Sequence, residues 1–420
     1  MKRTARDKRD MPHPRPVERI ELNEEHIGRR LAAAIVLLVF GGAMLAYAVW
    51  RLVTPETGWT TIEVEASAGV SCGGDFTFFY EATTTAERKA VTTHYTSLCR
   101  SAYEIFHSRE EFEGRGNLWT VNSHPNEAVE VDPALYGALE TIERSGSRLP
   151  YLGPVYDRYD DLFFCTDDSQ TAAFDPRLNE EVAREYGEIA AFANDPGAVR
   201  IELLGEDRVR LAVSPEYLAY AEREEIDQFI QLSWMTNAFI ADYIAEELTA
   251  LGYTKGTLSS YDGFTRNLDG SGREYAVSIY DRQGQNVYPA AVMSCRGPVS
   301  MVSFRDYPLN DQDMVRFYEM ENGEIRTLYL DPADGLCRSA VHDLMCYAGD
   351  RGCGEILLQT APVYIAGTLS AEALETLAAE GVQSIHCANG VICPTEAGIT
   401  LTQLFERDGV KYTLAPQKRK

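Results

Sequence analysis

The sequence predicts an α+β fold: one large domain of mixed, mostly antiparallel sheets with packed helices, preceded by one transmembrane helix. Helical and strand patterns are interleaved without the regular alternation that is typical of a parallel sheet. The pairs Asn322-Gly323 and Asn389-Gly390 indicate tight antiparallel hairpins. A chain of 420 residues with 45% hydrophobic content can bury a large core.

The transmembrane prediction comes from residues 31–50, which carry no charge and are long enough to cross a bilayer as a helix. Residues 1–30 carry nine Lys and Arg against six Asp and Glu. Basic residues before the span place the N-terminus in the cytoplasm and the remainder outside, so the expected location is the cell membrane with a single pass. Membrane lipid is therefore an expected partner.

Cleavage is one alternative reading of this span, because Ala46-Tyr47-Ala48 would suit a signal peptidase. A buried core helix is the other, and it is less favoured because Gly41-Gly42 and an unbroken apolar surface fit lipid better. We favour a retained anchor, since the charged region before the apolar run is unusually long for a signal peptide. The predicted organisation is as follows: a disordered cytoplasmic tail at 1–30, a transmembrane helix at 31–53, a linker and first strand at 54–71, and the large domain at 72–420.

The charge of the chain excludes one class of partner. Residues 52–420 contain 29 basic and 58 acidic residues, a net charge of −29. A domain this acidic would repel nucleic acid. Of the nine cysteines, Cys346/Cys353 and Cys387/Cys393 are close enough in sequence to be candidate disulfide pairs, and the odd number leaves at least one thiol free.

Periodicity and turn signals place the elements of the large domain in order. Apolar residues at three- and four-residue spacing predict amphipathic helices, and alternating residues predict strands. The expected helices cover 85–106, a segment opening at Asp132-Pro133, a segment around 182–192, 236–251, 354–365 and 370–380. The expected strands cover 60–64, 75–80, 199–204, 208–213, 257–260, 275–280, 290–294, 299–304, 327–330 and 341–347.

A hydrolase is excluded, although Gly69-Val70-Ser71-Cys72-Gly73 matches the G-x-S-x-G pattern. A nucleophile elbow needs a helix directly after the serine. Residues 75–80 alternate as a strand instead, so the match carries no catalytic meaning.

The segment Leu328 to Gly335 delivers two carboxylates, Asp331 and Asp334, into a turn in which Pro332 presets one backbone angle. Two hard oxygen donors in a fixed turn can hold Mg²⁺. The same D-P-x-D-G pattern is also an ordinary surface turn, and most such turns bind no metal.

The order of these pieces resembles the family of FAD:protein FMN transferases, the ApbE-like flavin transferases. The resemblance extends from about Cys72 to the C-terminus and makes the chain similar to a divergent member. It is carried by these segments: Gly73-Gly74, Gly116 to Asn122, Thr236 to Asp242, Leu258 to Gly263, Val292 to Cys295, Leu328 to Gly335, and Cys353 to Gly367.

The resemblance implies an extracytoplasmic, Mg²⁺-dependent enzyme that transfers FMN from FAD to a threonine of a target protein. The implied cofactors are FAD and Mg²⁺, and the implied partner is a flavin-accepting redox protein. The implied metal ligands are Asp331, Asp334 and the backbone carbonyl of Thr236. The implied flavin-binding residues are Ser294, Tyr261, Asp262 and Gly263.

Several positions depart from the family pattern. The family histidine is Leu328, so the group thought to assist phosphoryl chemistry is absent, and no catalytic residue is assigned. Asp334 stands in place of a metal-binding threonine. Tyr261 and Asp262 replace residues at a glycine pair, where they would crowd and repel a pyrophosphate.

Three functions remain open at this point. The first is a flavin transferase with an eroded active site. The second is a catalytically inactive ectodomain that binds flavin or protein. The third is a structural or interaction ectodomain unrelated to flavin. Among other polar residues, His124 and His342 sit in no motif, and Asp242 is interpreted as structural because a helix dipole stabilises a carboxylate in its early turns.

Overall fold

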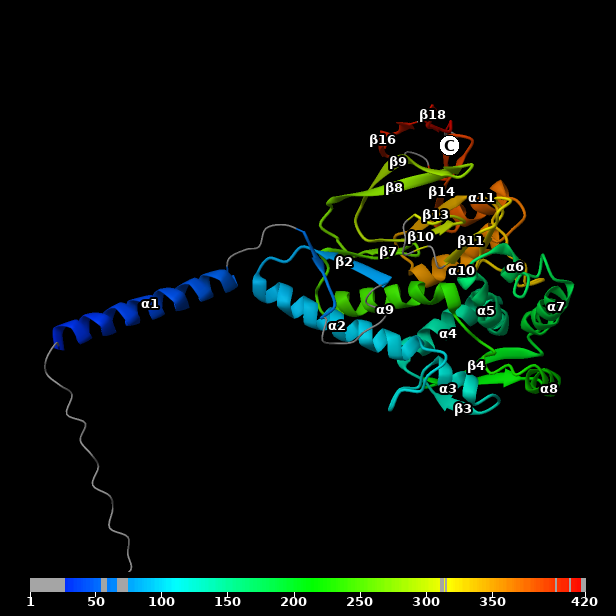
Figure 1. Cartoon of the computed structure of the whole chain (residues 1–420), viewed down its shortest axis with the longest axis horizontal. Helices are drawn as coiled ribbons and strands as arrows, with labels where there is room; N and C mark the ends of the chain where they lie inside the picture. Colours follow the sequence, from blue (N-terminus) through cyan, green and yellow to red (C-terminus); the bar gives the residue numbers. More distant parts are fainter. Residues whose placement is uncertain are drawn as a thin grey trace, which may run out of the picture. The chain divides into compact units, whose positions relative to one another are not determined.

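The computed structural model describes residues 27–53, 59–65, 75–309, 313, 316–396, 399–407 and 409–416. Internal contacts divide the chain into two compact units, Met1–Thr54 and Pro55–Lys420. The first unit contains helix α1, and the second contains the sheets and the remaining helices (Figure 1). The G-x-S-x-G segment at 69–73 lies outside the described residues.

The second unit is an α+β domain, as predicted. Its helices are α2 (Thr85–Phe106), α3 (Leu118–Ser123), α4 (Pro133–Ser145), α5 (Gly153–Tyr159), α6 (Asp168–Thr171), α7 (Glu180–Asn194), α8 (Pro215–Arg223), α9 (Thr236–Ala250), α10 (Cys353–Tyr364) and α11 (Ala371–Ala379), with 3₁₀ turns η3 (Leu149–Leu152), η4 (Asp160–Phe164) and η5 (Ser233–Met235). Its strands are β1 (Thr60–Ile62), β2 (Phe76–Tyr80), β3 (Ala128–Glu130), β4 (Val199–Gly205), β5 (Arg208–Val213), β6 (Gly256–Ser260), β7 (Phe264–Asn267), β8 (Glu274–Gln283), β9 (Asn286–Arg296), β10 (Val299–Arg305), β11 (Phe317–Glu319), β12 (Ile325–Thr327), β13 (Asp343–Ala348), β14 (Gln383–Ala388), β15 (Val391–Pro394), β16 (Leu401–Leu404), β17 (Glu406–Arg407), β18 (Val410–Lys411) and β19 (Thr413–Leu414).

A nine-stranded sheet forms the centre of this domain, in the order β1-β2-β6-β7-β10-β13-β14-β15-β19. Its neighbouring strands pair antiparallel except β15 and β19, which are parallel. Smaller sheets are β16-β9-β8, β3-β5-β4 and the hairpins β11-β12 and β17-β18. The mostly antiparallel pairing is the arrangement that the turn signals predict.

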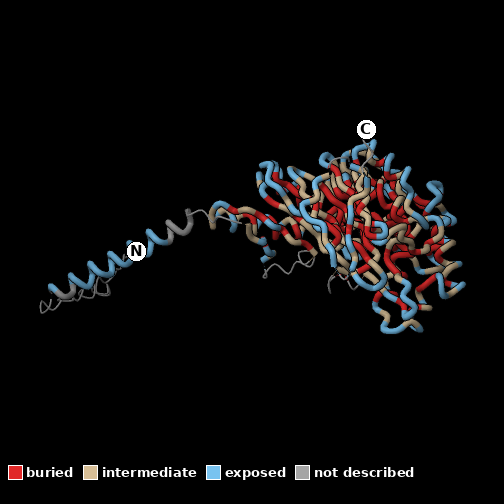
Figure 2. Tube along the Cα trace, turned by 90° about the horizontal axis from the view of Figure 1, so that it is seen from above, coloured by how far each residue is buried: buried red, intermediate tan, exposed pale blue. Residues whose placement is uncertain are grey.

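The middle strands β10 and β13 of the central sheet are apolar at consecutive positions and are buried on both faces. Val302 and Leu344 point to the face covered by helices α9 and α10, whereas Met301 and Met345 point to the sheet β16-β9-β8. Figure 2 shows the buried residues concentrated inside this layered region. The fold is therefore helices, central sheet and a second sheet in layers.

The long helices begin and end where their capping residues predict. Thr84 caps α2, with its side chain accepting a hydrogen bond from the Glu87 amide, and α2 has the predicted bounds. Asp132 caps α4, Pro133 occupies its first turn, and Gly146 ends it with a φ of 68°.

Asp242 of α9 holds three parts of the domain together. Its carboxylate accepts hydrogen bonds from the amides of Cys353 (2.7 Å) and Gly354 (2.8 Å) at the start of α10. It also forms an ion pair with Arg266 of β7. A side chain at Gly352 would overlap the Asp242 carboxylate, so the close approach requires glycine there. The geometry agrees with the predicted structural role of Asp242.

The cysteine pairs suggested by spacing are not formed. Cys346, Cys353, Cys387 and Cys393 are free thiols. Cys387 lies opposite Ile392 and Cys393 lies opposite His386 in the β14-β15 hairpin, so the two thiols project from opposite faces. Cys353 donates instead to the carbonyls of Thr265 and Met301, and burial raises its pKa.

Helix α1 (Ile27–Val53) covers the segment predicted to cross a membrane. Its apolar side chains between Leu31 and Leu45 are exposed. Among the helices that the structure describes, none combines the length and the apolar character that crossing a membrane requires.

Asp242→Ala should be strongly destabilising, because it removes the acceptor of two helix amides and leaves Arg266 unpaired where its side chain is only 18% exposed. We expect a loss of about 3 kcal/mol in the free energy of unfolding, measured with urea. The control is Asp350→Ala, whose side chain is 81% exposed. A loss for Asp242→Ala no larger than that of the control would contradict the structural role.

Candidate functional site

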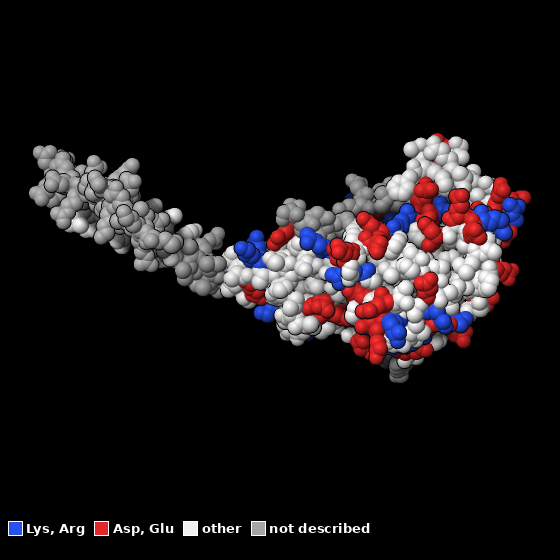
Figure 3. Space-filling view, turned by 90° about the horizontal axis from the view of Figure 1, so that it is seen from below, with Lys and Arg blue, Asp and Glu red and all other residues white. Residues whose placement is uncertain are grey.

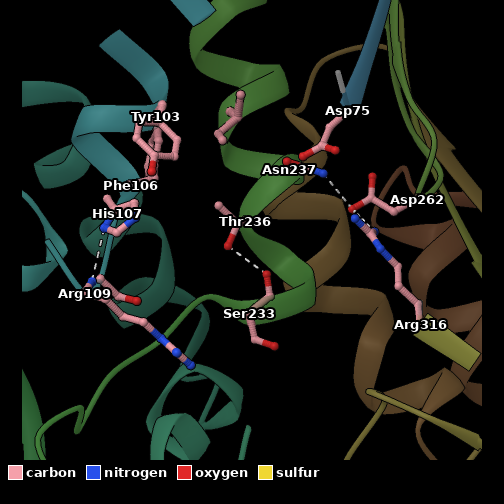
Figure 4. A pocket seen from close by; sticks show the side chains of 12 residues that line it. Asp75, Tyr103, Phe106, His107, Arg109, Ser233, Thr236, Asn237, Asp262 and Arg316 are labelled. Atoms are coloured by element: carbon pink, nitrogen blue, oxygen red, sulfur yellow. Dashed lines mark hydrogen bonds and ion pairs between the residues drawn. The ribbon is translucent and has the colours of Figure 1, made fainter. Parts of the chain in front are cut away.

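A cleft of about 550 Å³ lies between the end of α2, the start of α9 and the turn that joins β6 to β7. Figure 4 shows the side chains around it. The residues that line it are Asp75, Tyr103, Phe106, His107, Ser108, Arg109, Ser233, Thr236, Asn237, Ile240, Asp262 and Arg316.

The α2 side of the cleft combines aromatic and basic side chains. The rings of Tyr103 and His107 lie 4.9 Å apart, edge to face. The Arg109 amide donates to Nδ1 of His107 (3.2 Å), which requires that nitrogen to carry no proton. Burial lowers the pKa of His107, so its ring is neutral at pH 7. Arg109 forms an ion pair with Asp157 and is 55% exposed.

The α9 side supplies hydroxyl and amide groups from the first turn of the helix. Thr236 Oγ1 donates to the carbonyl of Ser233 (2.7 Å). Ser233 has a φ of 47°, in the left-handed region, which turns the chain into the helix. Asn237 Nδ2 donates to Asp262 Oδ2 (2.9 Å) and so connects α9 to the central sheet.

The sheet side holds the most buried charges of the cleft. Asp262 has a side chain only 7% exposed and forms an ion pair with Arg316, which is 28% exposed. Burial raises the pKa of Asp75, with Arg316 acting to lower it and Asp262 to raise it. Burial acts to lower the pKa of Arg316, but Asp262 and Asp75 hold it above its ordinary value. Arg316 therefore offsets part of the negative charge of the two carboxylates.

A second cavity, of about 20 Å³, lies directly behind this ion pair. Asp262 and Arg316 line both cavities, and the small one is closed by Trp234, Leu328 and Tyr329 among others. Leu328, which the resemblance aligns with a histidine of the flavin transferases, is buried. Its aliphatic side chain can neither donate nor accept a proton. The rings of Trp234 and Tyr329 lie 4.9 Å apart.

The turn that follows places its two carboxylates against an arginine. Arg338 Nη1 donates to Asp331 Oδ2 (2.8 Å) and to Asp334 Oδ1 (2.7 Å), and Nη2 donates to Asp334 Oδ2 (2.6 Å). Arg338 lowers the pKa of Asp334 through these hydrogen bonds. Within the described residues, no three His, Cys, Asp or Glu side chains come together as metal ligands would.

Of the residues predicted to form the site, the structure brings Thr236 and Asp262 to the cleft. Asp331 and Asp334 line neither cavity. The repulsion expected from Asp262 is offset by Arg316, and Tyr261 does not crowd the cleft because it is not part of its lining.

Ser294 lies on β9, in the sheet β16-β9-β8, where its amide donates to the Thr400 carbonyl (3.0 Å). It is therefore not beside Gly263. The serine that adjoins Gly263 is Ser303 of β10, whose amide donates to the Gly263 carbonyl (2.9 Å). Gly263 has a φ of 104°, and a side chain there would overlap the Ser303 carbonyl.

The two histidines singled out from the sequence lie elsewhere. His124 Nδ1 is hydrogen-bonded to the Thr120 carbonyl (3.0 Å). His342 pairs with Asp306 (2.9 Å) and lines a separate groove of about 830 Å³. The histidine in the cleft is His107. It follows the last residue of α2 and belongs to no motif, so no sequence pattern singles it out.

The described surface is mixed in charge. On the face drawn in Figure 3, acidic side chains are spread over the domain with basic side chains between them. No continuous basic patch is seen on the described part of this face.

This chain is similar to known proteins in its fold and not in its sequence. No protein-family model matches the chain, and no curated protein matches it by sequence. Among solved structures, the ApbE protein from Thermotoga maritima is 15% identical, with a TM-score of 0.53 over 82% of this chain and 97% of that one. The flavin transferase ApbE from Vibrio cholerae is 12% identical, with a TM-score of 0.53 over 79% and 93%.

The domain is thus a layered α+β protein with a polar cleft between helices and the central sheet. Its fold is that of the ApbE flavin transferases, and the resemblance predicted from the sequence is confirmed at the level of the fold. Sequence identities of 12% and 15% support a shared fold but not a shared function, so the function is inferred from the residues of the cleft.

Arg338→Gln should destabilise the protein in a pH-dependent way. Arg338 holds the pKa of Asp334 below its ordinary value in the folded state, so this contribution is present above the unfolded pKa and is lost as pH falls through the folded one. We expect a loss of about 1 kcal/mol in unfolding free energy at pH 7 that becomes smaller at about pH 2, below the ordinary pKa of an aspartate.

Urea unfolding at the two pH values measures this difference. The matched control is Arg184→Gln, whose ion pair with Glu181 is exposed on both sides. An equal loss at both pH values for Arg338→Gln would show that the pairing with the carboxylates is not its cause.

Proposed function

We propose that this protein binds a flavin nucleotide in the cleft between α2 and α9 and does not perform Mg²⁺-dependent FMN transfer through Asp331 and Asp334. The ApbE fold supports the flavin part of the proposal. The cleft also offers aromatic side chains at Tyr103 and Phe106, and an exposed basic one at Arg109. Aromatic faces suit a flat ring, and guanidinium groups suit phosphate.

One observation carries the second part: the guanidinium of Arg338 lies against both carboxylates of the turn, with three hydrogen bonds of 2.6–2.8 Å. Mg²⁺ needs oxygen ligands at about 2.1 Å in an octahedron. A guanidinium on the same oxygens takes up their acceptor positions and repels a second cation. The residues present therefore do not fit a Mg²⁺ site in this arrangement.

The two carboxylates of the turn also accept hydrogen bonds from backbone amides. Asp331 accepts a hydrogen bond from the Ala333 amide (2.9 Å), and Asp334 accepts one from the Leu336 amide (3.0 Å). These bonds are those of a D-P-x-D-G turn, so the stretch behaves here as a turn closed by an arginine.

Displacement at phosphorus needs a cation, positioning donors and a group that orients the attacking hydroxyl. Leu328 cannot orient a hydroxyl, and the charges of Asp262 and Arg316 largely neutralise each other. The cleft residues can bind a ligand and orient it. Asn237 and Arg316 fix the position of the Asp262 carboxylate, and the neutral ring of His107 lines the opposite side of the cleft. Binding without transfer follows from this set.

A divergent transferase that uses Asp334 or Ser294 in new roles is the alternative. Neither residue favours it, because Asp334 is held by Arg338 and Ser294 lies on β9, outside the cleft lining. Such an enzyme would also need a flavin-accepting redox protein as its partner.

Isothermal titration calorimetry of the full-length protein with FAD tests the proposal. We expect FAD to bind with an affinity that changes less than about twofold between excess Mg²⁺ and EDTA, because no step of binding uses the carboxylates of the turn. An assay for AMP release with a threonine-bearing acceptor should give no product. Mg²⁺-dependent AMP release would establish the transferase, and absence of FAD binding would remove the flavin proposal.

We also propose that residues 31–50 anchor the protein in the cell membrane, with the domain outside. The support is the uncharged length of this segment and the basic excess before it. The test is fractionation of cells that express the full chain: the protein should stay with membranes after a carbonate wash. A variant with Leu38→Arg and Val39→Arg should leave the membrane fraction, and retention of this variant would contradict the anchor.

A further inference from the structure

The carboxylate of Asp262 is only half satisfied by the protein. Its Oδ2 receives the Asn237 side-chain amide (2.9 Å) and contacts Nη1 of Arg316. Its Oδ1 is buried and has no hydrogen-bond partner among the described residues. The side chain is only 7% exposed, and the residue lines the cleft.

Arg316 presents a matching donor beside it. Its Nη1 is buried and, although it forms the ion pair with Asp262, makes no well-directed hydrogen bond within the described residues. An acceptor without a partner therefore lies beside a guanidinium nitrogen that makes no well-directed hydrogen bond, and both residues line the cleft. Each such group carries a desolvation cost unless water or a ligand satisfies it.

A phosphate does not suit this pair. At neutral pH a phosphate group offers acceptors and little donor capacity, and the charge of Asp262 repels it. An uncharged group that carries a donor next to an acceptor suits both atoms at once. Two parts of a flavin have that form: the imide edge of the ring, with N–H beside C=O, and the hydroxyls of the ribityl chain.

We propose that Asp262 Oδ1 and Arg316 Nη1 recognise an uncharged donor–acceptor edge of the ligand, an imide or a polyol, so that its phosphates point toward Arg109. This rests on the proposed flavin binding. Arg109 lies on the opposite side of the cleft in Figure 4 and is 55% exposed, as a contact for a solvated phosphate should be.

Flavin fluorescence titrations of the full-length protein test the proposal with three probes: FMN, riboflavin, which lacks phosphate, and lumiflavin, which lacks the ribityl chain. Riboflavin should bind within about threefold of FMN, because the exposed Arg109 adds little. Asp262→Asn should weaken riboflavin binding about tenfold to a hundredfold, since it turns a charged acceptor into an amide.

The probes also separate the two sources of the edge. If the protein recognises the imide edge of the ring, Asp262→Asn weakens lumiflavin binding by the same factor as riboflavin binding. If the protein recognises the ribityl hydroxyls, lumiflavin binds the unmodified protein weakly, and ribitol competes with riboflavin. Both results support the proposal.

The control variant is Asp161→Asn, an exposed carboxylate outside the cleft lining. Arg316→Lys keeps the charge and removes the planar donor, so it should also weaken riboflavin, and thermal melting checks that both cleft variants are folded. Unchanged riboflavin affinity in folded Asp262→Asn overturns the inference and leaves flavin binding intact. Failure of every flavin to bind the unmodified protein overturns both.

Discussion

The pairing of aspartates with arginines is the constraint on which this structure depends. In a chain with 64 acidic and 39 basic residues, carboxylates removed from water need a counter-charge or several amide donors. Arg266 meets Asp242 at the junction of α9, α10 and the sheet, and Arg316 meets Asp262 in the cleft. Arg338 meets the two carboxylates of the turn at 331–335. Stability, cleft electrostatics and the departure from metal chemistry all follow from these pairs.

The three pairs have different consequences because their surroundings differ. Asp242 also accepts hydrogen bonds from the first amides of α10, so its role is structural. Asp262 is buried in a cleft wall with one oxygen unused, so its role is recognition. Asp331 and Asp334 lie in a part-exposed turn, where a guanidinium supplies the positive charge that a divalent cation would otherwise provide. The protein itself thus supplies the counter-charge for both carboxylates of the turn.

Much of the fold could be predicted from the sequence, because its signals are local. The apolar period predicted helix α2 with the bounds that the structure has, and Asn322-Gly323 marked the β11-β12 hairpin. Membership of a sheet is a long-range property. Strands β8 and β9 leave the central sheet for a second layer, which carried Ser294 away from Gly263 and brought Ser303 in its place. The cleft residues His107 and Arg316 are far apart in sequence and share no motif, so only the folded chain brings them together.

The most direct test of the central claim is diffraction from crystals grown with excess Mn²⁺, whose anomalous signal locates the ion without ambiguity. The account predicts no anomalous peak within about 2.1 Å of the oxygens of Asp331 and Asp334, with Arg338 still hydrogen-bonded to both. A manganese ion bound to these two carboxylates, with the guanidinium of Arg338 turned away, would contradict it and restore the metal-dependent reading of the turn.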